Sequence, residues 1–358
     1  MTFEEFKDSV LSYLEKERDA IKKDIEEHKN LPEADKIEQG YLITDCFVKA
    51  CIDDVYELST PNNNTKLRTG DKIDIVDREH KHKIEGTIVE NLIERISVTN
   101  VSQKLEEEVA YDVVVRESEF LGSLIQLWQN IEDGTSGTGY IDILRDAGVP
   151  TFYEDIHINE DDIPQRFNEN QHKAIVDALK TPSLYCIQGP PGTGKTDVLA
   201  YIAMTYSRQG VEVLILSNTH QAVNNALNKI ANYDDLPIIK IGETLKAQDL
   251  KDNIRTAQTY NQYYNLRKRK TGYSNGDVVG MTIHAAISNL GLRNSGFLPG
   301  IILVDEAGQV PLTFGTTFGF FKSSSIVLIG DDRQMPPIYH ETLKDDPISI
   351  SIFTSIVR

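Results

Sequence analysis

Apolar residues recur at helical spacing near the start of the chain. The positions that share one helix face are Phe3, Phe6, Val10, Leu14, Ile21 and Ile25. Thr2 and Glu5 form a capping-box pattern ahead of them, and Pro32 ends the pattern. This spacing predicts a long amphipathic helix. Because its opposite face is densely charged, we expect the helix to be a solvated structural support.

The pattern changes to short alternating runs after the turn-forming residues 61–64. These runs are residues 72–76, 86–89, 95–98 and 111–115. Several short strands in succession predict a small β-barrel. Helical spacing returns over residues 119–131, and the Gly/Ser/Thr-rich residues 134–139 then interrupt it as a linker.

Strand-like apolar runs alternate with helical segments from about Phe167 onward. This alternation is typical of a parallel α/β sheet. We therefore expect a helical stalk region over residues 1–60, a small β-barrel with a stalk helix and linker over residues 61–165, and an α/β domain over residues 166–358.

Residues 189–196 read Gly-Pro-Pro-Gly-Thr-Gly-Lys-Thr between a strand-like run and a helix. This is the phosphate-loop pattern in the strand–loop–helix context that it requires. The glycines let backbone N–H groups face the phosphates, and the following helix presents its positive end to them. We expect Lys195 to reach the β- and γ-phosphates and Thr196 to bind Mg²⁺. The predicted ATP contacts are Gly189, Pro190, Pro191, Gly192, Thr193, Gly194, Lys195 and Thr196.

Two later strand-like runs end in polar side chains. Residues 301–304 are followed by Asp305 and Glu306, at the strand end where open α/β sheets place ligand-contacting groups. We expect Asp305 to hold the magnesium shell and Glu306 to orient or deprotonate the attacking water. Residues 325–329 lead to Gln334, whose amide can donate to a γ-phosphate and accept from water. The predicted catalytic residues are Glu306, Lys195 and Gln334.

These strings together resemble the helicases of superfamily 1, and within it the group typified by the nonsense-mediated-decay (up-frameshift) helicase and its immunoglobulin-μ-binding relatives. The resemblance is strong over residues 167–337 and looser over the barrel region. Residues 305–309 match the family's Asp-Glu-Ala-x-Gln, and residues 330–337 match its Gly-Asp-x-x-Gln-Leu-Pro-Pro with Met335 in place of the usual leucine. AAA+ ATPases share the phosphate loop, but they carry a polar sensor on the later strand and an arginine finger beyond it.

The resemblance implies an α/β fold, namely the RecA-like parallel sheet of a P-loop NTPase with an accessory small β-barrel on a helical stalk. It implies that Gln171 reads the adenine. It also implies that Ser217, Asn218, Thr219 and Thr282 contact the nucleic-acid backbone. In the family the barrel rests against the nucleic acid, whereas the residues alone are equally consistent with a barrel that serves only folding or protein contact.

Four tyrosines, Tyr260, Tyr263, Tyr264 and Tyr273, surround the basic residues 267–270. Such a run can follow a phosphate backbone while a ring stacks on a base. It can also be a solvated helix face, and we favour this second interpretation because the chain has a net charge of -18.

That charge argues against a protein that coats nucleic acid by bulk electrostatics, so any nucleic-acid contact must be local. The three cysteines, Cys46, Cys51 and Cys186, form no CxxC pair, which indicates a reduced cytoplasmic setting with the thiols as small hydrophobes. The apolar runs are strand-length, far short of a membrane span, and we expect no membrane partner.

The family's motor has two RecA-like domains, and arginines from the second domain touch the γ-phosphate. The chain stops at Arg358 with no arginine-finger motif. We therefore expect ATP binding, with weak or absent hydrolysis until a second RecA-like domain joins in cis or in trans. The predicted function is the ATP-binding motor half of a helicase or translocase acting on single-stranded DNA or RNA. A second hypothesis is a nucleotide-dependent interaction or regulatory module without unwinding activity.

Overall fold

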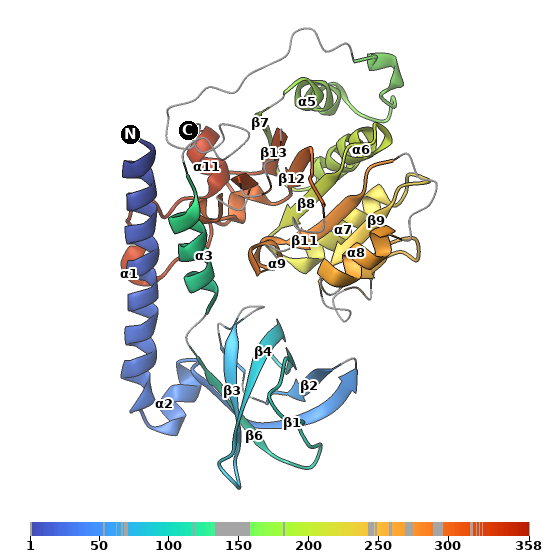
Figure 1. The fold of residues 1–358 in the computed structure, drawn as a ribbon. Helices are drawn as coiled ribbons and strands as arrows, with labels where there is room; N and C mark the ends of the chain where they lie inside the picture. The colour runs from blue at the N-terminus through green and yellow to red at the C-terminus, as the bar shows by residue number, and fades with distance from the viewer. Residues whose placement is uncertain are drawn as a thin grey trace. The chain divides into compact units, whose positions relative to one another are not determined.

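The structure is a computed structural model (Figure 1). It describes residues 2–132 and 158–357, except residues 53, 62, 66, 68–70, 117–118, 182, 243–246, 248, 258–259, 269–274, 289–295, 316–317, 320, 322 and 324. The chain forms two compact units, one of Leu14–Ile125 and one of Met1–Tyr13 with Gln126–Arg358. The expected linker at residues 134–139 lies outside the described residues.

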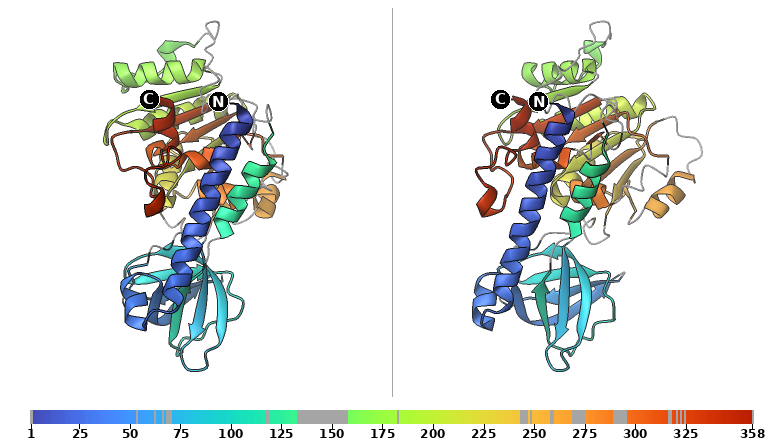
Figure 2. Two further views of the ribbon diagram at one scale, coloured as in Figure 1. Left: turned by 90° about the vertical axis from the view of Figure 1, so that its left-hand side faces the viewer. Right: turned by 60° about the vertical axis from the view of Figure 1, so that its left-hand side comes forward.

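The unit Leu14–Ile125 contains a closed barrel, which Figure 2 shows from two further sides. Its strands are β1 (Leu42–Ile52), β2 (Val55–Ser59), β3 (Lys72–Asp77), β4 (Lys83–Asn91), β5 (Arg95–Thr99) and β6 (Tyr111–Val115). They pair antiparallel in the order β1-β2-β5-β4-β3-β6, and closure of the barrel leaves no unpaired sheet edge. Inward-facing apolar side chains, among them Ile43, Leu58, Ile75 and Val113, form its core.

The structure confirms the four expected strands but places two more, β1 and β2, within residues 1–60, which the sequence analysis assigned to a helical region. The barrel therefore begins well before the expected boundary. The period-two signal of β1 is broken, because its register shifts between Ile43 and Cys46 and again between Val48 and Ala50. Asp45 also has a left-handed backbone, with φ 57°. Bulges of this kind move side chains out of strict alternation.

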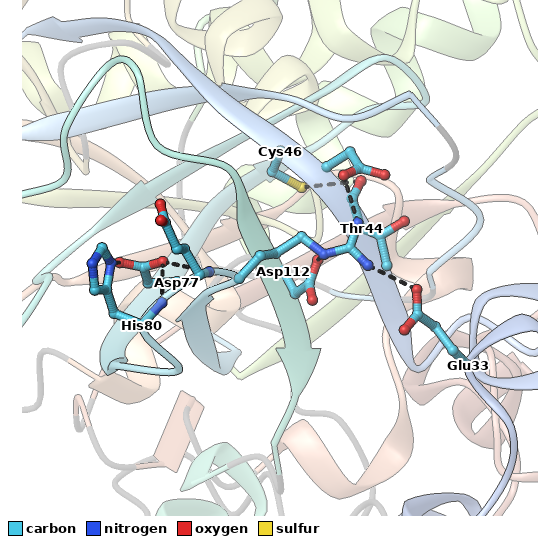
Figure 3. A network of polar contacts seen from close by, with 9 residues as sticks. Glu33, Thr44, Cys46, Asp77, His80 and Asp112 are labelled. Carbon is cyan, nitrogen blue, oxygen red and sulfur yellow. Dashed lines mark hydrogen bonds and ion pairs between the residues drawn. The ribbon is translucent and has the colours of Figure 1, made fainter.

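An arginine ties one helix to the barrel (Figure 3). Arg78, in the β3–β4 turn, pairs with Glu33 of α2 (Glu33–Glu38) at 2.9 Å, with Asp45 of β1 at 2.5 Å and with Asp112 of β6 at 3.1 Å. Burial raises the pKa of Asp112, whereas the guanidinium of Arg78 opposes that rise. The three carboxylates share one cation, so Arg78 holds elements that are distant in the sequence.

The other unit contains a parallel sheet, which confirms the expected α/β class. Its strands are β7 (Leu184–Gln188), β8 (Val213–Ser217), β9 (Ile238–Ile241), β10 (Arg255–Ala257), β11 (Val278–Thr282), β12 (Ile301–Val304) and β13 (Ser325–Gly330). Their order is β10-β9-β11-β8-β12-β13-β7, and every pairing is parallel. Every residue of β8, β11, β12 and β13 is buried, as expected for a parallel sheet covered on both faces.

The helices of this unit include α5 (Glu169–Lys180), α6 (Lys195–Arg208), α7 (His220–Ile230), α8 (Tyr260–Lys268), α9 (Ile283–Ser288) and α11 (Ile352–Val357). Short 3₁₀ turns, η4 (Ala307–Gln309) and η5 (Leu312–Gly315), follow β12. Apolar residues of α5, α6 and α7 form one core with the sheet. The carboxyl ends of parallel strands share one edge, and this edge carries the candidate site.

Two helices are divided between the units. The first, α1 (Phe3–Lys29), ends before Pro32 as expected, and Thr2 and Glu5 form its capping box through hydrogen bonds of 2.7 and 3.2 Å. The second, α3 (Glu119–Asn130), has the expected helical spacing. Among the described residues, no helix is both long enough and apolar enough to cross a membrane.

Candidate nucleotide site and nucleic-acid edge

The phosphate loop lies between β7 and α6, where the sequence predicts it. Gly192 and Gly194 both have φ 78°, a left-handed conformation that favours glycine. A Cβ on Gly189 would lie 2.8 Å from the Thr193 hydroxyl, so this position also requires glycine. The loop backbone therefore depends on the residues that define the motif.

Lys195 lies at the first position of α6 with its charge inside the loop. Its Nζ donates to the carbonyl oxygens of Gly189 at 2.5 Å and Pro190 at 3.1 Å. The Thr193 hydroxyl donates to the same Pro190 carbonyl at 2.8 Å. An ammonium group beside the positive end of a helix is suited to a phosphate anion.

Asp305 and Thr196 meet across the site. Asp305 directly follows β12 and is 4% exposed. The hydroxyl of Thr196 donates to Asp305 Oδ2 at 3.4 Å. A hydroxyl and a carboxylate beside a phosphate loop are oxygen donors of the kind that Mg²⁺ takes, so the residues present fit the magnesium that the family implies.

Burial and the neighbouring carboxylate of Glu306 raise the pKa of Asp305 to about 6. The Glu306 backbone N–H, which donates to Asp305 Oδ1 at 3.0 Å, opposes this rise together with Lys195 and Thr196. A carboxylate that is costly to ionise when the site holds no cation is well suited to a divalent ion, because the cation removes that cost.

We expect Asp305→Asn to stabilise the protein when nucleotide and magnesium are absent. The pKa of Asp305 is raised from 3.8 to about 6 in the folded state. The contribution of this carboxyl group to stability is therefore fully present below pH 3.8, and it is lost as the pH rises through 6. At pH 7.5 the free energy of unfolding of Asp305→Asn should exceed that of the wild type by on the order of 2 kcal/mol. This difference should shrink toward pH 4.

Urea unfolding in the presence of a chelator measures this difference. Asp345→Asn, which replaces an exposed carboxylate, is the matched control and should be neutral at both pH values. Equal stability of wild type and Asp305→Asn at both pH values would contradict the electrostatic assignment.

Glu306 adopts a left-handed backbone, with φ 54°. For a residue with a side chain this conformation is strained, and such strain is concentrated at functional sites. This turn brings η4 close to the end of β13. A Cβ on Gly308 would lie 2.6 Å from the Asp331 carbonyl oxygen, and a Cβ on Gly330 would lie 2.8 Å from the Gly308 nitrogen. Two glycines therefore let the two motifs pack backbone against backbone.

Gln334 lies on the loop that follows β13. Its backbone N–H donates to the Asp331 carbonyl at 3.3 Å, and its Nε2 lies 3.5 Å from Asp331 Oδ2. The sequence analysis did not single out Asp331, a buried carboxylate that also accepts from the Arg333 N–H at 3.1 Å. It acts as the anchor of this loop, and the only sequence signal for it was its place in the motif.

Gln171 contacts the phosphate loop directly. Its Oε1 accepts from the Asn168 N–H at 2.9 Å and its N–H donates to Asn168 Oδ1 at 3.0 Å, which forms a capping box at the start of α5. Its Nε2 donates to the Thr193 carbonyl at 2.8 Å. Adenine recognition by Gln171 stays a prediction, and a second role, holding the loop, is now visible.

The expected nucleic-acid residues lie together at the carboxyl edge of the sheet. Ser217 ends β8 and pairs in register with Thr282, which ends β11. Thr219 caps α7, and its hydroxyl accepts from the Ala222 N–H at 3.2 Å. The Ser217 hydroxyl and the Asn218 side-chain oxygen are buried and make no hydrogen bond within the described part of the chain.

Asn218 also joins this edge to the nucleotide site. Its Nδ2 donates to the main-chain carbonyl of Gln309, in the motif that contains Asp305 and Glu306. The two residues are 91 positions apart in the chain, so no local sequence pattern predicts the contact.

Two residues of the tyrosine and basic run, Tyr263 and Arg267, make structural contacts. Tyr263 is fully buried, and its hydroxyl donates to Asp277 Oδ2 at 3.2 Å. Arg267 pairs with Glu212 at 2.5 Å. The solvated-face interpretation is therefore wrong for Tyr263, which belongs to the core. Arg269, Lys270 and Tyr273 lie outside the described residues.

Comparison with known proteins adds to this geometry. Residues 166–265 match a family described as an AAA domain. The DNA replication ATP-dependent helicase/nuclease JHS1 of Arabidopsis thaliana is 25% identical over 328 residues, which are 83% of this chain and 23% of that protein. The corresponding DNA2 of Saccharomyces cerevisiae is 30% identical over 187 residues, which are 48% of this chain and 11% of that protein. The chain thus spans less than a quarter of the length of either relative.

These matches support an ATP-binding helicase domain in this chain. Its structure also has a likeness to the Arterivirus nonstructural protein 10 helicase, with a TM-score of 0.40, 12% identity and coverage of 89% of this chain and 53% of that one. In the parallel sheet, β7, β12 and β13 lead into the expected nucleotide residues, whereas β8 and β11 carry or lead into the expected nucleic-acid residues.

Proposed function

We propose that this chain supplies the ATP-binding half of a motor that moves along single-stranded DNA or RNA, with hydrolysis requiring a second RecA-like domain. The observation that carries the proposal is the contact of Asn218 with the Gln309 carbonyl. It links the strand ends expected to bind nucleic acid to the segment that holds Glu306. A motor needs such a link, because nucleic-acid binding must alter the hydrolytic geometry.

Each of the predicted site residues has its own role in ATP binding or hydrolysis. Lys195 and the loop N–H groups bind and neutralise the phosphates. Thr196 and Asp305 would hold the Mg²⁺, which would offset charge on the phosphate oxygens. Glu306 accepts the proton of the attacking water, and Gln334 holds that water by its side-chain carbonyl. Gln171 keeps the loop in place through the Thr193 carbonyl.

The nucleic-acid contacts proposed for Ser217, Asn218, Thr219 and Thr282 are short polar side chains at strand and helix ends. Groups of this kind bind phosphate and sugar, which carry no sequence information. We therefore propose a track of single-stranded nucleic acid with little sequence preference. The curated relatives are named as DNA replication helicases, which supports DNA as the track.

The motifs at residues 305–309 and 330–337 support a finer assignment to the up-frameshift type of superfamily 1.

The three cysteines are free thiols. Burial raises the pKa of Cys46 and of Cys186 to about 12, so neither is a reactive thiolate. Cysteines that are free rather than paired in disulfides support the proposal of a cytoplasmic location.

Calorimetric titration with ATP and magnesium tests the nucleotide site. Lys195→Ala should weaken ATP binding by at least about thirtyfold, since a charge-assisted hydrogen bond to phosphate contributes roughly 2 kcal/mol or more. Lys173→Ala, which removes an exposed lysine of α5, is the matched control and should bind as the wild type does. Equal affinity of the Lys195→Ala variant and the wild type would refute the proposed site.

A further inference from the structure

A tryptophan far from the phosphate loop is bonded to the segment that carries Glu306. Trp128 is the one tryptophan of the chain, lies on α3 and is fully buried. Its indole Nε1 donates to the carbonyl oxygen of Thr313 at 2.8 Å. Thr313 belongs to η5, whose residues are all buried. The indole therefore fixes a main-chain atom shortly after the proposed catalytic carboxylate.

Residues 306–315, called here the Glu306 segment, form a hydrogen-bonded string. The Gln309 N–H donates to the Glu306 carbonyl at 3.0 Å, and the Val310 N–H donates to the Ala307 carbonyl at 3.2 Å. Further along, the Phe314 N–H donates to the Pro311 carbonyl at 3.0 Å. The segment thus consists of two hydrogen-bonded turns that follow one another directly in the chain.

The same segment is held from its sides. The Ile352 N–H donates to the Val310 carbonyl at 2.8 Å, and the Leu312 N–H donates to the Ile350 carbonyl at 2.9 Å. The ring of Phe314 packs edge-on against His284 of α9, with centroids 5.5 Å apart. The Glu306 segment thus contacts α9, which follows Thr282, as well as α3.

Trp128 is itself held by the start of α1. Its ring packs edge-on against Phe6 at 5.9 Å between centroids. Lys7 Nζ donates to the carbonyls of Gln129 at 3.1 Å and Ile131 at 2.9 Å, which caps the end of α3. Figures 1 and 2 show the first part of α1 beside the end of α3. These contacts join the start of α1 to the end of α3.

The chain passes between its two units at Tyr13/Leu14 in α1 and at Ile125/Gln126 in α3. The two helices that hold Trp128 are therefore also the two covalent connections to the barrel unit.

We propose that Trp128 is a positioning residue for Glu306: by holding the Thr313 carbonyl it sets the Glu306 segment, and so couples α1 and α3 to ATP turnover. The inference rests on the proposed role of Glu306. It predicts an effect on turnover without an effect on nucleotide affinity, because the hydrogen bond and the ring contact of Trp128 are made with Thr313 and Phe6, which lie outside the phosphate loop.

The first test uses the wild-type chain. Because Trp128 is the single tryptophan, tryptophan emission reports on its surroundings, which include the Thr313 carbonyl and the Phe6 ring. ATP with magnesium should change the emission with the same midpoint as calorimetric binding, and Lys195→Ala should remove the change at the same ATP concentration. ATP binding by calorimetry with unaltered emission would overturn the proposal while leaving the proposed function intact.

The second test uses Trp128→Phe, which keeps an aromatic ring and removes the donor. With the second RecA-like domain present, kcat should fall by about three- to tenfold, the loss expected for one hydrogen bond, while KM and the Kd for ATP stay within about twofold. Tyr263→Phe, which removes a buried hydrogen bond to Asp277 outside the Glu306 segment, should leave kcat near the wild-type value.

A wild-type kcat in Trp128→Phe, or an equal fall in kcat and ATP affinity, would overturn the positioning role. If the wild-type chain itself shows no ATPase with the second domain, the proposed function fails instead. The emission test still decides the coupling in that case.

Discussion

Replacing Glu306 by glutamine should abolish ATP hydrolysis and leave ATP binding unchanged. The amide keeps the shape of the carboxylate but cannot accept a proton, and general-base catalysis contributes roughly a hundred- to ten-thousandfold to rate. Glu306 has φ 54°, and its main-chain N–H donates to Asp305. These two features belong to the main chain and do not involve the side-chain carboxylate. The variant should therefore fold and bind magnesium as the wild type does. Phosphate release in the presence of the second domain, beside calorimetric binding of ATP, measures the separation.

A matched control is Glu341→Gln, which alters an exposed carboxylate whose ion pair with Lys344 is 3.2 Å long. It should hydrolyse ATP at the wild-type rate. Turnover by Glu306→Gln at that same rate would assign the base to another residue, and loss of ATP binding would show that Glu306 serves the fold.

The nucleotide site could be predicted from the sequence because its determinants are local. Residues 189–196 form one continuous run, and the loop geometry follows from glycines at φ 78°. Asp305 and Glu306 stand at the end of a four-residue apolar strand, where parallel sheets gather their functional groups. The structure puts Thr196 and Asp305 together at 3.4 Å as this reasoning requires.

The features that escaped prediction depend on distant partners. Trp128 and Thr313 are 185 positions apart, and Asn218 and Gln309 are 91 apart, so neither contact leaves a pattern in the sequence. Bulges hid β1, and the three-residue strand β10 is too short to show a period. Tyr263 was misread because the net charge of the chain, on which the solvated-face interpretation rested, does not say which side of a helix faces the core.

Adding a second RecA-like domain should raise ATP hydrolysis by orders of magnitude and make it respond to single-stranded nucleic acid. In the transition state, charge develops on the γ-phosphate oxygens, and neither Glu306 nor Gln334 supplies a positive charge to offset it. An arginine from another domain supplies that charge and is worth about a thousand- to a hundred-thousandfold in kcat. Lys195 donates to the loop carbonyls of Gly189 and Pro190, so it supplies positive charge only on the phosphate-loop side of the site.

The most direct measurement is the steady-state ATPase rate of these 358 residues alone and after completion with the second domain, in cis or in trans, with and without single-stranded DNA. Lys195→Ala in the completed motor sets the background. We predict slow turnover by the chain alone, a gain of at least about a thousandfold on completion, and further stimulation by the nucleic acid. Robust hydrolysis by the 358 residues alone, stimulated by single-stranded DNA, would contradict the account.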